Sequence, residues 1–156
     1  MNFNKPNVKT FVPDGSDIEN ALERTTHLAI GAHQDDLEIF AYNGIAECYG
    51  ERDKWFMGVT VTNGAGSSRV GVYEKYTDEA MANVRIEEQN KAAFAGDYSA
   101  QFQLDYTSSE VKDTSNPGAT EDIIQIAERA AAKVVYLHNP ADKHETHVAV
   151  LSKCIE

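Results

Sequence analysis

A short apolar run that ends in a histidine and two acids constrains this chain most. Residues 28–32 are Leu-Ala-Ile-Gly-Ala between polar flanks, a pattern typical of a strand buried in a parallel sheet. His33, Asp35 and Asp36 follow within four residues. Because ligands bind at the carboxyl ends of strands in open α/β sheets, these side chains mark a candidate site.

A second apolar run with a similar ending lies far along the chain. Residues 134–137 are Val-Val-Tyr-Leu, and the next ten residues hold three of the five histidines. Two of these, His144 and His147, are three residues apart, so on one helical turn they share a face. His138 is expected to shape the turn after the strand.

Between the two runs, apolar and amphipathic segments alternate. The expected strands span residues 28–32, 55–62, 102–106 and 134–137. The expected helices span residues 36–49, 78–95 and 120–133, and a last one begins near His147. Residues 1–15 are expected to be irregular, and Ser16 with Glu19 predicts a capping box for a short helix to about Arg24.

This order predicts the α/β class, with a doubly wound, mostly parallel, Rossmann-like sheet and helices on both faces. In the common version of that fold the four strands lie in the order 3-2-1-4, so the first and fourth are neighbours. The motif after the first strand and the histidines after the fourth should therefore meet in one crevice.

The charge balance excludes several classes of partner. The chain has 25 acidic against 14 basic residues and a formal net charge of −11, whereas nucleic-acid and anionic-membrane surfaces need basic patches. No apolar stretch reaches the ~20 residues of a membrane span, and the N-terminus lacks the apolar core of a signal peptide. Cys48 and Cys154 form no disulfide framework. We expect a cytoplasmic protein without nucleic-acid or membrane partners, and a homo-oligomer stays open.

Several segments resemble the PIG-L/LmbE-like zinc N-deacetylases. His33-Gln34-Asp35-Asp36 with Glu38 resembles the first signature of that family, and His144-x-x-His147, preceded by Pro140 and Asp142, resembles the second. Arg85-Ile86-Glu87-Glu88 looks like the helix between the signatures, and Thr62-Asn63-Gly64 resembles the loop after the second strand. The resemblance runs from about Leu28 to the end of the chain.

The resemblance implies a role for each matched residue. Zinc, or another divalent metal, would be held by His33, Asp36 and His147, a ligand set that suits catalytic zinc sites. Asp35 resembles the general base, and His144 resembles the second catalytic residue, a protonated imidazole that supports the oxyanion or the leaving amine. Arg85 and Asn63 are the matched residues expected to contact substrate, and Asp142 is expected to hold an imidazole in place. Arg69, in the glycine-rich loop, is a further candidate contact, for a phosphate or carboxylate on the substrate.

Other readings of the same residues stay open. Asp35 has the position of a helix N-cap, and Arg85 with Glu88 has the spacing of a surface salt bridge. His144 matches a surface histidine in a polar loop. Each of these three would then have no chemical role.

The implied function is metal-dependent removal of an acetyl group from an N-acetylglucosamine-type amide. The alternatives are a metal hydrolase for another amide or ester, and an inactive sugar-binding or scaffold domain. We expect one domain over residues 1–156, a C-terminally truncated N-terminal portion of the family's domain that lacks its later strands.

Overall fold

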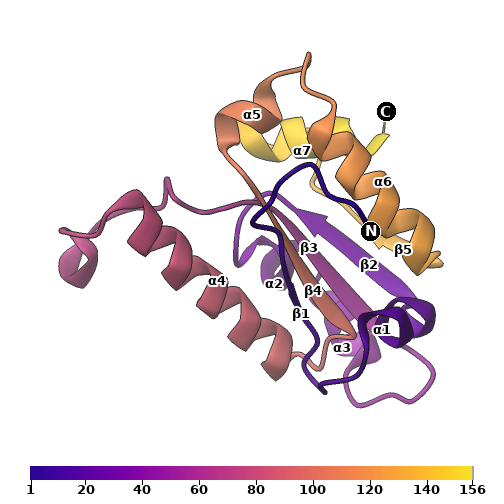
Figure 1. Ribbon diagram of the computed structural model, residues 1–156. Helices are drawn as coiled ribbons and strands as arrows, with labels where there is room; N and C mark the ends of the chain where they lie inside the picture. Colours follow the sequence, from indigo (N-terminus) through magenta and orange to yellow (C-terminus); the bar gives the residue numbers. More distant parts are fainter. Residues whose placement is uncertain (156) are drawn as a thin grey trace.

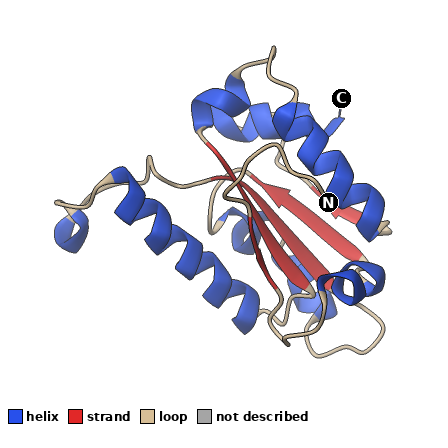
Figure 2. Ribbon diagram, in the orientation of Figure 1, coloured by secondary structure: helices blue, strands red, loops and turns tan. Residues whose placement is uncertain are grey.

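One five-stranded sheet forms the centre of the protein, with helices on both faces (Figures 1 and 2). The computed structural model describes residues 1–155, and the strands are ordered β1-β4-β3-β2-β5. Their bounds are β1 (Lys9–Phe11), β2 (His27–Gly31), β3 (Phe56–Thr62), β4 (Ala100–Tyr106) and β5 (Val134–Tyr136). The four strands β2 to β5 are parallel, and β1 pairs antiparallel with β4. The predicted α/β class and the 3-2-1-4 order of the parallel strands are confirmed.

Seven α-helices and one 3₁₀ turn accompany the strands in residues 1–155. Their bounds are α1 (Ile18–Arg24), α2 (Asp36–Phe40), α3 (Tyr42–Cys48), η1 (Gly71–Tyr73), α4 (Asp78–Ala95), α5 (Ser108–Lys112), α6 (Gly118–Ala130) and α7 (Glu145–Ile155). In Figure 1, α1, α5, α6 and α7 lie on one side of the sheet, and α2, α3 and α4 lie on the other. The connections between strands therefore run over both faces of the sheet, as a doubly wound fold requires.

The alternation of side chains along the strands supplies two apolar cores. Leu28 and Ile30 of β2 face the larger core, which packs against α1, α6 and α7, while Ala29 faces the smaller core under α2 and α3. In the larger core Ile126 of α6 and Val150 of α7 are fully buried. These contacts fix α7, which carries the second histidine motif, on the same sheet as β2.

Helix α4 meets the sheet through polar side chains. Gln89 of α4 and Gln101 and Gln103 of β4 are all buried. The Nε2 atom of Gln103 donates to the Ile86 carbonyl at 3.1 Å, and Gln89 donates to Glu38 at 3.0 Å. Because buried polar groups need partners, these hydrogen bonds hold α4 against the sheet beside the contact of the buried Ala93.

Several local predictions are wrong. Residues 9–11 form a strand, the helix expected over 36–49 is broken at Ala41, and α5 lies in a stretch where no element was expected. Helix α1 begins after Asp17 without a side-chain cap, so Ser16 and Glu19 form no capping box. Strand β5 is an edge strand whose Val135 is 50% exposed, although an apolar run of this kind indicates a buried strand.

Candidate metal and catalytic site

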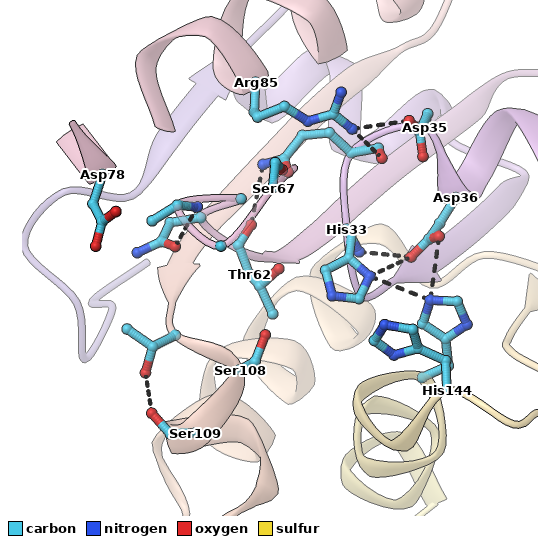
Figure 3. Close-up of a pocket in the computed structure, with 17 residues that line it drawn as sticks. His33, Asp35, Asp36, Thr62, Ser67, Asp78, Arg85, Ser108, Ser109 and His144 are labelled. Carbon is cyan, nitrogen blue, oxygen red and sulfur yellow. Dashed lines mark hydrogen bonds and ion pairs between the residues drawn. The ribbon is translucent and has the colours of Figure 1, made fainter. Parts of the chain in front are cut away.

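The carboxyl ends of β2, β3 and β4 and the start of α7 surround one cleft of about 680 Å³. Its walls come from residues 33–36, 62–67 and 107–109, with Asp78, Arg85, His144 and His147. Figure 3 shows Arg85 and Asp35 at one end and His144 at the other, with His33 and Asp36 between them. The two sequence motifs therefore meet in one cavity, as the topology predicts.

Three side chains point donor atoms at one another inside this cleft. Nδ1 of His33 lies 3.2 Å from Nε2 of His147. The carboxylate of Asp36 lies between them, with Oδ2 at 3.4 Å from His33 Nδ1 and Oδ1 at 3.4 Å from His147 Nε2. Two imidazole nitrogens and one carboxylate therefore converge on a single region of the cleft.

These separations fit a zinc ion. Zinc binds nitrogen and oxygen ligands at about 2.0–2.2 Å in a tetrahedron, which places its ligands about 3.3–3.5 Å from one another. His33 Nδ1 and His147 Nε2 lie 3.2 Å apart, and each lies 3.4 Å from a different oxygen of the Asp36 carboxylate. Three protein ligands leave a fourth position open, which is the arrangement of catalytic rather than structural zinc sites.

The carboxylate of Asp36 is held ionised. Its Oδ2 atom accepts the backbone N–H of His33 at 2.6 Å. Burial alone raises the pKa of Asp36, but the hydrogen bonds and imidazoles around it outweigh burial and hold the pKa well below its usual range. A carboxylate must be ionised to bind a metal, and this environment keeps it so.

Asp142 orients His147. Its Oδ2 lies 3.0 Å from Nδ1 of His147, and its Oδ1 accepts the backbone N–H of His144 at 2.8 Å. With Nδ1 protonated toward the carboxylate, Nε2 of His147 presents its lone pair to His33 and Asp36. The imidazole partner of Asp142 is therefore His147 and not His144.

His138 is buried beside the three side chains, and its Nε2 lies 3.4 Å from Oδ2 of Asp36, so that Asp36, His138 and His147 form a potential metal group by distance alone. Its Nε2 accepts the backbone N–H of Ala32 at 2.8 Å, which uses the lone pair that a metal would need. Its ring stacks on His147 with centroids 4.1 Å apart. His138 thus ties the loop after β5 to the end of β2, in keeping with its expected role in the turn.

His144 is exposed and lies over the other two histidines of the cleft. Its ring stacks on His147 at 4.4 Å and meets the His33 ring edge-on at 4.8 Å. His33, His144 and His147 also form a group whose ligand atoms all lie within 4.8 Å of one another. Burial and then the imidazoles of His147 and His33 lower the pKa of His144, which favours the neutral ring over the protonated form expected from the sequence.

Asp35 occupies the N-cap position of α2 but does not cap it. Its backbone is left-handed, with φ of 73°, and its side chain makes no cap hydrogen bond. Oδ2 accepts Nη2 of Arg85 at 2.9 Å, and the described residues give Oδ1 no hydrogen-bond partner. Asp35 lies in the wall of the cleft, one residue from Asp36. A carboxylate in that position can take a proton from a water in the cleft.

Arg85 pairs with Glu88, as their spacing on α4 indicates, and also with Asp35. Besides Asp35 it donates to the carboxylate of Glu88 and, through Nη2, to the Gln34 carbonyl at 2.7 Å. Burial lowers the pKa of Arg85, but the two carboxylates outweigh burial and raise it. The guanidinium therefore stays charged and fixes the loop after β2.

The other two expected substrate contacts differ in position. Asn63 lines the cleft, and its Oδ1 accepts the N–H of Ala65 at 3.1 Å. Arg69 lies outside the cleft, where it pairs with Asp78 and donates to the carbonyls of its own loop, Ala65, Ser67 and Tyr76. The structure therefore brings Asn63 to the cavity and assigns Arg69 to the loop.

The sequence did not indicate the buried hydrogen-bonded residues that hold the backbone of Asp35. Gln89 accepts the backbone N–H of Asp35 at 3.0 Å and donates to Glu38, whose Oε1 also accepts the Tyr98 hydroxyl at 2.6 Å. The available signal is spacing, because Gln89 lies four residues after Arg85 and shares its helix face. Gln34, to which the motif assigned no role, is buried and donates to the Thr62 carbonyl at 3.1 Å.

Comparison with known proteins agrees with this geometry. No curated protein matches the chain, and no helix over residues 1–155 is both long and apolar enough to cross a membrane. The sequence model of the PIG-L family, described as GlcNAc-PI de-N-acetylase, matches residues 28–155, which include both histidine motifs. This chain therefore belongs to the PIG-L family of de-N-acetylases.

Proposed function

We propose that this chain is a zinc-dependent N-deacetylase that hydrolyses the acetamide of an N-acetylglucosamine-type substrate. The observation that carries the proposal is the convergence of His33, Asp36 and His147, with every pair of facing donor atoms 3.2–3.4 Å apart, next to the carboxylate of Asp35. Another divalent metal could take the same ligands. Membership of the family supports the reaction class and the sugar-type substrate.

A zinc ion held by these three residues would polarise the amide carbonyl and lower the pKa of a water molecule beside it. Asp35 takes the proton of the attacking water at its carboxylate, because Arg85 holds Oδ2 while Oδ1 has no partner among the described residues. Arg85 also keeps that carboxylate from rotating away from the cleft. Proton transfer of this kind is efficient when base and water are within hydrogen-bond reach.

His144 stands on the other side of the same centre. A neutral imidazole retains one N–H donor, and the ring of His144 lies 4.8 Å from that of His33. It is therefore placed to donate a hydrogen bond to negative charge that develops on the carbonyl oxygen. Asp142 contributes indirectly, by holding His147 in the orientation that the metal needs.

Acetate release tests this function. The zinc-loaded protein should release acetate and leave a free amine from N-acetylated amino sugars, and treatment with a chelator followed by zinc should abolish and restore turnover. Tight sugar binding without acetate release would favour the inactive sugar-binding domain. Turnover that is unchanged after complete removal of metal would contradict the proposal.

A further inference from the structure

A second, smaller cavity opens beside the proposed base. It has a volume of about 300 Å³ and shares three wall residues, Asp35, Ser67 and Arg85, with the main cleft. Its remaining walls come from the loop around η1 and from one face of α4. A group attached to a substrate in the main cleft can extend into this side compartment.

The far wall of the side compartment is largely apolar. It consists of the ring of Tyr73 on η1 and the side chains of Met81 and Val84 on α4. The Tyr73 ring packs edge-on against Tyr76, with centroids 5.3 Å apart. A cavity of about 150 Å³ already accepts a benzene ring, so this compartment accommodates a ring-sized group with an apolar face.

Neither guanidinium near the cleft is available for an anion. Arg85 is paired with Asp35 and Glu88 and also donates to the Gln34 carbonyl. Arg69 is paired with Asp78 and with carbonyls of its loop. A phosphate or carboxylate on the substrate would have to displace one of these partners.

The walls of both cavities also carry a negative balance. Among the described residues that line them, Arg85 is the one Lys or Arg, against the four carboxylates Asp35, Asp36, Asp78 and Glu88. A bound divalent cation reduces this excess without reversing it. Since like charges repel and an unpaired anion is costly to desolvate, the walls disfavour an anionic group.

Resting on the proposed function, we infer that the substrate is an N-acetylglucosamine-type glycoside with a neutral, largely apolar aglycone. The aglycone occupies the side compartment between η1 and α4, where Tyr73 and Val84 select it. Tyr73 supplies the ring face, and Val84 excludes charge from the helix side. The amide stays in the main cleft, beside His33, Asp36 and His147.

Three probes on the zinc-loaded protein test the inference: N-acetylglucosamine, its phenyl glycoside and its 1-phosphate. Affinity is measured by calorimetry, and acetate release is measured separately. Burial of one apolar ring is expected to make the phenyl glycoside bind about tenfold more tightly than the free sugar. The 1-phosphate should bind no more tightly than the free sugar.

Two variants connect this preference to the compartment. Tyr73→Ala should remove most of the phenyl preference, while Val72→Ala, whose side chain is 81% exposed on the same turn and lines neither cavity, should keep it. Val84→Lys adds a cation to the wall and should bind the 1-phosphate several-fold more tightly than the parent does. Misfolding of the variant cannot produce such a gain.

The inference is overturned if the 1-phosphate binds as tightly as the phenyl glycoside, or if neither of these two probes binds. It is also overturned if Tyr73→Ala and Val72→Ala keep the same preference for the phenyl glycoside over the free sugar. The proposed function fails on a different result, namely no acetate release from any of the three probes even where the binding preference is present.

Discussion

At the scale of single residues, one carboxylate organises the second histidine motif. Asp142 accepts from the backbone of His144 through Oδ1 and holds the ring of His147 through Oδ2. A hydrogen bond from an imidazole N–H to a carboxylate in such a position fixes the tautomer and raises the basicity of the metal-facing nitrogen. The sequence predicted that Asp142 holds an imidazole but not which one, because the choice depends on how the turn before α7 closes.

Replacing Asp142 should weaken the metal site. Asp142→Asn keeps an oxygen for the N–H of His144 but removes the carboxylate from His147, so zinc affinity should fall about 10–100-fold. Competition with a chelator of known affinity measures this. Glu145→Gln is the control, since Glu145 is exposed in the same segment and its carboxylate lies 3.6 Å from Lys112, away from the histidines. Equal zinc affinity in Asp142→Asn and Glu145→Gln would contradict the orienting role.

Replacing Asp35 should affect turnover and leave the metal in place. Asp35→Asn keeps the shape of the side chain but removes the base, so turnover should fall by about 10²–10⁴ while zinc content stays near that of the parent. The nearby exposed Glu87, which lines neither cavity, supplies the control variant Glu87→Gln. Parent-like turnover in Asp35→Asn would rule out this base.

At the scale of elements, the loop after β3 depends on one glycine. Gly64 has φ of +70°, and a Cβ there would lie 2.5 Å from Oε1 of Gln34 and 2.9 Å from the Arg85 side chain. The loop after β3 therefore packs directly against the residues that support Asp35. The same loop carries Asn63 into the cleft.

Alanine substitutions along this loop should separate backbone strain from steric clash. Gly71→Ala changes a residue at φ of +60° with open space around it and should cost about 1–2 kcal/mol. Gly64→Ala adds the clash and should cost about 2–4 kcal/mol. Gly66→Ala, with nothing within 4 Å of its Cβ position, should lie within about 0.5 kcal/mol of the parent. Urea unfolding measures all three, and equal costs for Gly64→Ala and Gly71→Ala would exclude the clash.

The elements show where local sequence signals suffice. Helix α4 begins and ends where the pattern predicts, because Thr77 caps it through the Ala80 N–H and Gly96 follows it. The pattern of a hydroxyl residue followed three positions later by Glu occurs at both Ser16 and Thr107, yet only Thr107 with Glu110 forms a capping box, at the start of α5. The turn at Asp14 and Gly15 moves Ser16 one residue before the cap of α1, which no short pattern reveals.

At the scale of the whole molecule, the site follows from strand order. The sequence was sufficient for the order of the parallel strands and therefore for the meeting of His33 with His147 across 114 residues. It was insufficient for the polar layer under α4, because Gln89 meets Gln101, and Asn90 meets Gln103, only once strand register and helix rotation are set. The side compartment likewise depends on how η1 folds over α4.

The two cysteine thiols should make the stability of the folded protein sensitive to alkaline pH. Burial raises the pKa of Cys48 above its model-compound value of 9.0 and that of Cys154 to about 12. Their contribution to stability is thus fully present below pH 9 and is lost as the pH rises from 9 toward 12. The free energy of unfolding should fall over that range, and less steeply in a Cys48→Ala/Cys154→Ala variant. Parallel pH profiles for the two proteins would contradict this account.

Zinc binding by matched variants of the cleft tests the central claim most directly. Protein purified without chelator should hold about one equivalent of zinc, and His33→Ala, Asp36→Ala and His147→Ala should each lose it. His144→Ala should keep it, although His144 belongs to a second potential group with His33 and His147. Elemental analysis with a competition titration gives the answer. Full zinc affinity in Asp36→Ala, together with its loss in His144→Ala, would show that the metal is held by the three histidines instead.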